Sequence, residues 1–209
     1  RYFFGKELQS MELKQMTPAE FSAVYQERMT ADFPADELRP LSSMKDLHAQ
    51  GNYLVYGCYD EQGLAAYAAL VLREGAALLD YYAVGASRRG QGVGQKCLSL
   101  LQKEPLGADF LLLEVESVES AQTPAQVEER TRRIRFYHHC GCSETPVYAH
   151  LFGVEFLILC LPLGGSPLPA AQEVEQAMLG TYRLIVPPIV GPGEEAFQKV
   201  CKVWIKEER

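Results

Sequence analysis

The stretch from Ala77 to Gln95 combines residue types that suit an anionic ligand. An apolar run ends at Val84, and two arginines and three alternating glycines follow before an amphipathic segment begins. Glycines allow close backbone approach and positive φ, and the first N–H groups of a helix attract an anion. Arginine adds positive charge. The sequence predicts a phosphate-binding loop that contains Arg88, Arg89, Gly90, Gln91, Gly92, Val93, Gly94 and Gln95.

Three acidic residues could bind and deprotonate an amine. Glu114 and Glu116 lie two apart on a predicted strand, so both side chains point to one face near the end where ligands collect. Asp80 lies on the neighbouring predicted strand and could join them. One carboxylate could remove the proton of an attracted amine. The alternative is a solvated strand end with salt bridges to Arg132 or Arg133.

Tyr137 shares one stripe of a predicted helix with Val127 and Ile134. The stripe alone favours a core tyrosine. His138, His139, Cys140 and Cys142 follow, but their spacing fits no closed zinc set, so we expect no metal site.

The loop must be positioned by a strand before it and a helix after it. The predicted strand 77–84 precedes a helix that Pro105 ends, and the apolar segment 109–116 follows as an interior strand. This order implies a parallel pair joined by a right-handed crossover.

The remaining elements are predicted from caps and alternation. Residues 8–15 resemble a strand, residues 52–72 a β-hairpin, and residues 147–152 and 155–161 two further strands. Capping boxes with proline at the first helical position begin at Thr17 and Thr123. These patterns predict an α/β (α+β) domain over residues 1–163.

Residues 162–169 are the clearest linker, and the segment 164–209 is predicted to be a helical extension packed on the same domain. Helices are expected over 171–179 and 194–206, the second from Phe197, Val200, Cys201 and Trp204 at helical spacing. This extension has no functional interpretation from the sequence.

Composition limits the partners. The chain has 209 residues and a formal net charge of −7, with no basic run, so a nucleic-acid partner is not expected. The longest apolar run, residues 156–163, is too short to span a bilayer. The first four residues carry no signal-peptide pattern, and the six cysteines are scattered as free buried thiols usually are. We therefore expect a cytoplasmic protein.

Two other kinds of nucleotide-binding loop fit the sequence less well. A Rossmann-type NAD site would place a ribose-binding acid at the end of the 109–116 strand. The loop, however, reads GxGxG instead of GxGxxG, two arginines occupy the turn, and no second mononucleotide-binding half follows in the sequence. A P-loop needs lysine where Gln91 stands.

Two segments resemble signatures of the GNAT superfamily of N-acetyltransferases. Residues 89–94 match its Q/R-x-x-G-x-G/A loop, and residues 135–141 resemble its second signature, an aromatic-Tyr pair followed by glycine. The likeness covers roughly residues 8–161, and Cys142 departs from the usual aromatic. The combination of Asp80 with residues 114–116 and 133–137 resembles a bacterial subgroup of this superfamily whose substrates are unassigned.

The resemblance implies acetyl coenzyme A as cofactor and a mixed, mostly antiparallel sheet with a central parallel pair and helices on both faces. The strand edge at Ala83 and Val84 would separate from the next strand and pair with the pantetheine arm, with an N–H near Val84 facing the thioester oxygen. Tyr137 would protonate the coenzyme A thiolate.

We therefore expect acetyl transfer to an amine in a ternary complex, with Glu114, Glu116 and Asp80 around a small-molecule or peptide amine. A homodimer is compatible with this prediction. Two alternatives remain open: a module that senses acyl-CoA without turnover, and a Rossmann-type NAD-binding protein.

Overall fold

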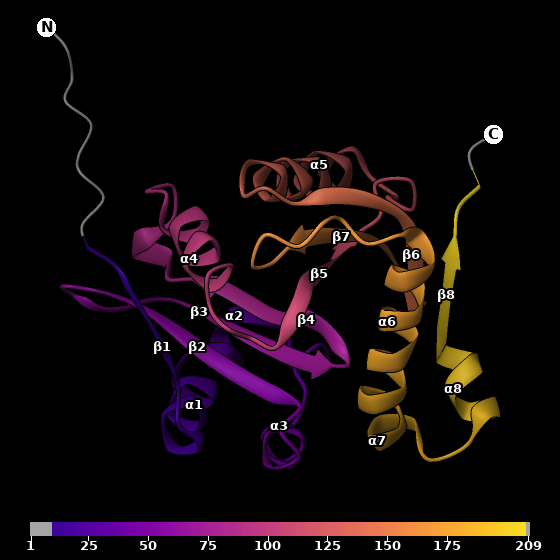
Figure 1. Ribbon diagram of the computed structural model, residues 1–209, viewed down its shortest axis with the longest axis horizontal. Coiled ribbons are helices and arrows are strands. Elements are labelled where there is room, and N and C mark those ends of the chain that lie inside the picture. The colour runs from indigo at the N-terminus through magenta and orange to yellow at the C-terminus, as the bar shows by residue number, and fades with distance from the viewer. Residues whose placement is uncertain (1–9, 208–209) are drawn as a thin grey trace, which may run out of the picture.

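An eight-stranded sheet runs through the computed structural model, which describes residues 10–207 (Figure 1). The order across the sheet is β1-β2-β3-β4-β5-β7-β6-β8. All neighbouring strands are antiparallel except β4 and β5. The strands are β1 (Glu12–Gln15), β2 (Tyr53–Asp60), β3 (Gly63–Arg73), β4 (Gly75–Val84), β5 (Ala108–Glu116), β6 (Ser143–Leu151), β7 (Val154–Pro162) and β8 (Cys201–Ile205).

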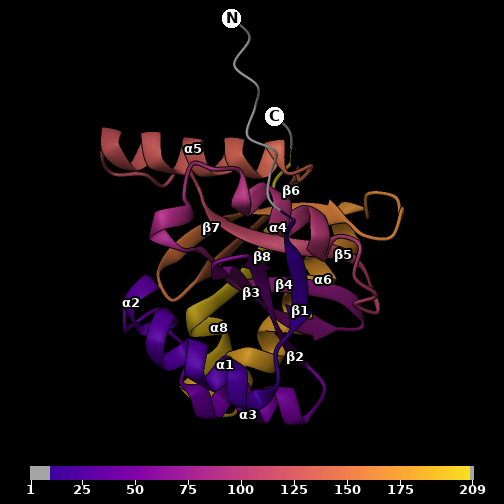
Figure 2. The ribbon, with the colours of Figure 1, turned by 90° about the vertical axis from the view of Figure 1, so that its left-hand side faces the viewer.

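The helices lie on both faces of this sheet, as predicted. They are α1 (Pro18–Val24), the π-helical η1 (Tyr25–Met29), α2 (Thr30–Asp32), α3 (Leu41–Ala49), the 3₁₀ turn η2 (Ala86–Arg88), α4 (Val93–Leu101), α5 (Pro124–His139), α6 (Ala171–Ile185), α7 (Pro187–Val190) and α8 (Glu194–Val200). Helices α4 and α5 cover one face, and α1, α3, α6 and α8 pack into the core of the other (Figure 2).

The parallel pair opens into a fork. Pairing between β4 and β5 begins at Gly75 and ends where Leu78 faces Leu112. On the other side of β4, the register with β3 shifts by one residue. Tyr81 faces Ala69 and Leu79 faces Leu70, so Asp80 has no partner residue on β3, which is the geometry of a β-bulge. Beyond Leu78 the two strands continue without pairing, so the separation expected at Ala83 and Val84 is present.

Two capping boxes begin helices where the sequence predicts them. The Thr17 hydroxyl accepts from the Glu20 N–H at 3.3 Å, and the Glu20 carboxylate accepts from the Thr17 N–H at 2.7 Å. Thr123 and Gln126 repeat the arrangement at the start of α5, again with proline at the first helical position. Each box satisfies two N–H groups that a helix start leaves unpaired.

The C-terminal segment differs from its predicted structure. The helix expected over 194–206 ends at Val200, and residues 201–205 form β8, which pairs with β6. The alternation in Cys-Lys-Val-Trp-Ile and its β-branched and aromatic residues favour a strand. Trp204 stacks on Tyr148 with ring centroids 5.9 Å apart, an inter-strand contact that the helical spacing concealed.

Helix α6 is longer than predicted. It continues past Gly180 to Ile185, and its inner stripe of Val174, Met178, Tyr182 and Ile185 is buried. The helix contacts β3, β4, β6 and β8, and Figure 1 shows it between the β4–β5 pair and β8. The first two residues of the strand predicted over 8–15 lie outside the described residues.

Candidate active site

The glycine loop presents unpaired backbone N–H groups beside the end of β4. Gly90 and Gly92 have positive φ values of 73° and 79°, and Gly92 caps α4 in the left-handed conformation. Within residues 10–207, the N–H groups of Gly90 through Gln95 donate to no protein acceptor. A run of free amides at the start of a helix is a site for an anion.

Close packing fixes this helix start against the fork. A Cβ added at Gly94 would lie 3.0 Å from Phe136 Cζ and 3.3 Å from Val84 Cγ2, so the backbone approaches β4 and α5 closely. The Tyr82 hydroxyl donates to the Gly94 carbonyl at 2.6 Å. The loop is therefore held in place before any ligand binds.

The two arginines of the loop have different environments. Arg88 lies 2.9 Å from the Asp60 carboxylate and donates to Gln62 at 2.7 Å, so its charge is already compensated. The predicted role of its side chain at the phosphate would require Arg88 to leave Asp60. Arg89 is exposed, and its Nε donates to the Val84 carbonyl at 3.1 Å. Arg89 thus keeps a solvent-facing guanidinium beside the free amides.

The other polar side chains of the loop bind protein carbonyls. Gln91 donates to Ser87 at 2.8 Å and Gln95 to His139 at 3.1 Å. Val93 is buried, so only its backbone can face a ligand. For these three residues, a role in cofactor binding would come from the main chain.

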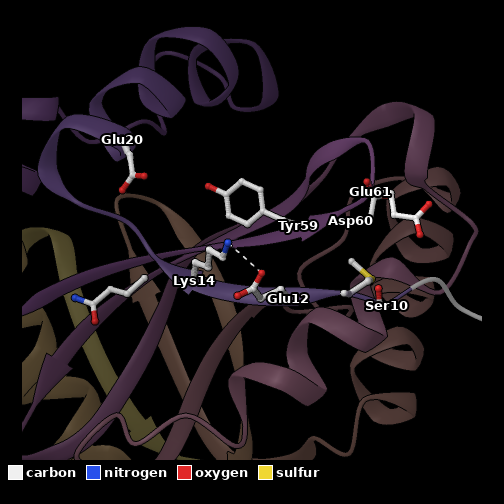
Figure 3. Close-up of a pocket in the computed structure, with 9 residues that line it drawn as sticks. Ser10, Glu12, Lys14, Glu20, Tyr59, Asp60 and Glu61 are labelled. Carbon is white, nitrogen blue, oxygen red and sulfur yellow. Dashed lines mark ion pairs between the residues drawn. The ribbon is translucent and has the colours of Figure 1, made fainter.

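A surface hollow of about 700 Å³ lies away from the fork, beside β1 and the β2–β3 turn (Figure 3). Its lining includes the Glu12–Lys14 ion pair at 3.0 Å and Asp60, the partner of Arg88. None of the predicted catalytic or cofactor residues lines it. The hollow is therefore separate from the site that the sequence predicts.

Asp80, a predicted residue of the amine pocket, forms a buried ion pair. Its carboxylate lies 3.2 Å from Arg39 Nη2, and both side chains are 8% exposed. Tyr53 also donates to it at 2.8 Å. With a cation and a hydroxyl already bound, Asp80 is a fixed part of the fork rather than a free carboxylate.

Glu114 lies on the same side of the fork, on β5, and accepts a hydrogen bond from the Tyr182 hydroxyl of α6. Burial raises the pKa of Glu114 to about 7; the Tyr182 hydrogen bond opposes the rise, Asp80 adds to it and Arg39 opposes it. A carboxylate with a pKa near neutrality can accept a proton at physiological pH and hold it only weakly.

Glu116 forms an ion pair with Arg130 of α5, not with Arg132 or Arg133. Arg130 also donates to the Ser117 carbonyl at 2.7 Å and to the Ser120 hydroxyl at 3.1 Å. Glu116 therefore anchors the loop after β5. The predicted role of Glu116 as a second carboxylate for the amine would require it to leave Arg130.

Tyr137 lies on the opposite face, partly buried against the core that α4 and α5 share with the sheet. Burial raises its pKa to about 12, an effect that the nearby Arg133 opposes. Within the described part of the chain, its hydroxyl has no hydrogen-bond partner. The group stays protonated at neutral pH and is free to donate.

The cysteines and histidines form no metal centre among residues 10–207, where no cluster of three or more His, Cys, Asp or Glu side chains could hold an ion. All six cysteines are free thiols, as predicted. No helix in the described ranges is both long and apolar enough to cross a bilayer.

A forked parallel pair with unpaired helix-start amides beside one strand end is an arrangement that suits an anionic cofactor. A profile of the Acetyltransferase (GNAT) family matches residues 13–142, more than half of the chain. The chain belongs to this family. No curated protein sequence gives a significant match.

Solved structures share the fold. A GNAT-family protein from Bacteroides thetaiotaomicron is 19% identical, with a TM-score of 0.64 over 87% of this chain and 99% of its own. The ribosomal-protein-S18-alanine N-acetyltransferase of Escherichia coli is 20% identical, with a TM-score of 0.54 over 77% and 97%. The yncA protein of Salmonella typhimurium, solved with acetyl-CoA, is 19% identical, with a TM-score of 0.51 over 78% and 99%.

The protein is thus an acetyltransferase, and acetyl coenzyme A is its acetyl donor. The free amides of the glycine loop fit the anionic part of this molecule, since phosphate groups bind well at helix starts.

Sequence reasoning missed two residues that touch the predicted acids. Arg39 lies in a loop with no motif around it, and nothing local indicates its partner 41 residues away. Tyr182 gave a weak signal: it is a tyrosine on an otherwise apolar stripe, and a buried hydroxyl usually needs a partner. That partner, Glu114, is 68 residues away.

Proposed function

We propose that the protein acetylates an amine by direct attack in a ternary complex, with Glu114 as general base and Tyr137 as general acid. The observation that carries this proposal is the fork between β4 and β5. Free loop amides lie beside the end of β4, and Glu114 lies on the face of the sheet that α6 covers. Acetyl-CoA, when bound, supplies a thioester whose acetyl group moves to the amine while the thiol leaves.

The backbone binds and polarises the donor. The amides of residues 90–95 and the exposed Arg89 hold its diphosphate. The free edge of β4 at Ala83 and Val84 pairs with its extended arm, and an N–H near Val84 faces the thioester oxygen. A preorganised N–H of this kind contributes about 3 kcal/mol to lowering a barrier.

Two side chains move the protons. Glu114 accepts the proton that the amine nitrogen loses, either directly or through water, and its pKa of about 7 suits that task. Tyr137 donates its proton to the departing sulfur and regains one from solvent afterwards. Glu114 lies on the α6 face of the sheet and Tyr137 packs on the opposite face, so the proposal requires each group to reach the gap between β4 and β5 from its own side.

The charges around Glu114 favour an acceptor with one amine. Asp80 is compensated by Arg39 and Glu116 by Arg130, whereas Glu114 forms no ion pair within residues 10–207, although Arg39 is near enough to favour its ionised form. A polyamine would need further negative charges. We propose a small-molecule monoamine or a peptide amine as the substrate class.

An assay of coenzyme A thiol release tests this function. Purified protein is incubated with acetyl-CoA and with primary monoamines, peptides with a free N-terminus, and spermidine. We expect thiol release with a monoamine or peptide and a lower kcat/KM for spermidine. Binding of acetyl-CoA by calorimetry without thiol release for any amine would contradict catalysis and favour the acyl-CoA sensor.

Two variants test the roles of the side chains. Glu114→Gln and Tyr137→Phe should each lower kcat about 10²- to 10⁴-fold, the usual range for a lost acid or base. Affinity for acetyl-CoA should remain. Tyr25→Phe, which removes a hydroxyl that donates to the Arg39 carbonyl at 3.1 Å, is the matched control and should keep nearly full activity.

A further inference from the structure

Helix α6 of the C-terminal segment reaches both strands of the fork through polar contacts. On the β5 side, the hydroxyl of the fully buried Tyr182 donates to Glu114. On the β4 side, the Ile185 carbonyl accepts from Arg39 Nη1 at 3.1 Å, and Arg39 holds Asp80. The two contacts lie close together on one helix, at residues 182 and 185.

These contacts lie at the position where the proposed reaction needs its base. The Tyr182 hydroxyl donates to Oε1 of Glu114, whereas Oε2 of the same carboxylate has no hydrogen-bond partner within residues 10–207. A carboxylate with one oxygen fixed by a donor and the other free has a defined orientation toward an incoming N–H. Burial on the α6 stripe leaves the Tyr182 ring no freedom to turn away.

We propose that the C-terminal segment completes the acceptor side of the fork, with Tyr182 as a positioning residue that fixes the Glu114 carboxylate for proton transfer. This inference rests on the proposed function, in which Glu114 is the base. The family match ends at residue 142, so the segment that supplies Tyr182 lies beyond it.

The charge balance supports this assignment. Four groups face Glu114: Tyr182 from α6, Asp80 from β4, Arg39 from the loop before α3, and Cys201 from β8. Tyr53 faces the cluster through Asp80. Burial and Asp80 disfavour the ionised carboxylate, whereas Tyr182 and Arg39 favour it. Loss of the Tyr182 hydroxyl should therefore leave more of Glu114 protonated at neutral pH.

The pH profile of Tyr182→Phe tests the proposal. We expect the acid limb of kcat/KM to move to higher pH by about one unit, so that activity falls about fivefold at neutral pH, about tenfold well below it, and recovers in alkaline solution. Met178→Leu, on the same buried stripe but without a polar atom, should keep the parent profile. An equal loss at every pH would mean a merely structural role and would overturn the proposal.

A second measurement needs no activity. Protein labelled with ¹³C at glutamate carboxyls is titrated by NMR, and Glu114→Gln identifies the Glu114 signal. We expect this signal to titrate at higher pH in Tyr182→Phe than in the parent; an unchanged midpoint would overturn the proposal. Tyr182→Leu serves as a second variant without the hydroxyl. Absence of acetyl transfer in the parent would overturn the proposed function, whereas an unchanged NMR midpoint would overturn the role of Tyr182 even in an active enzyme, so the two failures are distinguishable.

Discussion

The two sides of the fork are built in opposite ways. The cofactor side comes from one continuous stretch, residues 83–95, and its N–H groups from 90 to 95 are unpaired. The acceptor side brings together two pairs from distant parts of the chain, the Arg39–Asp80 ion pair and the Tyr182–Glu114 hydrogen bond. Arg39 also donates to the Ile185 carbonyl of the helix that carries Tyr182.

The difference follows from what each side must do. An anion binds to donors that are free, and exposed amides at a helix start remain solvated until it arrives. A general base needs a raised pKa, which requires burial, and a buried charge is tolerated only when other groups compensate it. The cofactor side can therefore be local, whereas the acceptor side must gather partners from the whole chain.

The largest expected effect concerns the stability of the acceptor side. Arg39→Met leaves Asp80 buried without a cation and removes the donor to the Ile185 carbonyl. The free energy of unfolding should fall by about 3–5 kcal/mol, the usual cost of breaking a buried pair from one side. Urea denaturation measures this change. Asp80→Asn in the same background should restore part of the loss; if it restores none, the ion pair is not the cause.

The next prediction concerns how stability changes with pH. Burial raises the pKa of Glu114 from 4.5 to about 7, so between these pH values the folded chain holds a proton that the unfolded chain has lost. Stability from this group is therefore present at low pH and is lost as pH rises to about 7.

Comparison with Glu114→Gln isolates this contribution. Relative to the variant, the free energy of unfolding of the parent should fall by roughly 3 kcal/mol between acid and neutral pH, since one pKa unit corresponds to about 1.36 kcal/mol. Chemical denaturation at a series of pH values measures the difference. Parallel curves for the two proteins would show that Glu114 does not titrate with a raised pKa.

The smallest effect separates the two neighbouring arginines of the cofactor side. Arg89→Gln should weaken acetyl-CoA binding about tenfold, and less at high salt, because the exposed guanidinium attracts the phosphates. Arg88→Gln should leave the affinity nearly unchanged, since Arg88 is already paired with Asp60. Calorimetry at two salt concentrations compares them. Equal losses for both variants would mean that Arg88 leaves Asp60 when the donor binds.

The same contrast explains which features could be predicted from the sequence. The glycine loop and the strands beside it follow from residues adjacent in the chain, and both capping boxes are local patterns of four residues. The pairing of Arg39 with Asp80 and of Tyr182 with Glu114 depends on how distant elements pack. No spacing rule connects such residues, so the sequence does not reveal which groups Asp80 and Glu114 contact.

The C-terminal segment shows the same limit. Phe197, Val200, Cys201 and Trp204 have helical spacing, yet the chain turns from α8 into β8 at Cys201 because the edge of β6 is available for pairing. An exposed strand edge provides hydrogen-bond partners that no local propensity reveals.

The central claim is that free amides after Arg89 bind the diphosphate of acetyl-CoA, and calorimetry on Gly92→Asp tests it most directly. Gly92 has a positive φ, which asparagine and aspartate tolerate better than most residues. Gly92→Asn is therefore the control, because asparagine has nearly the same shape as aspartate but carries no charge. We predict that Gly92→Asn retains measurable affinity while Gly92→Asp loses at least tenfold more, because its carboxylate repels the phosphates. Equal affinities for the parent and Gly92→Asp would contradict the account.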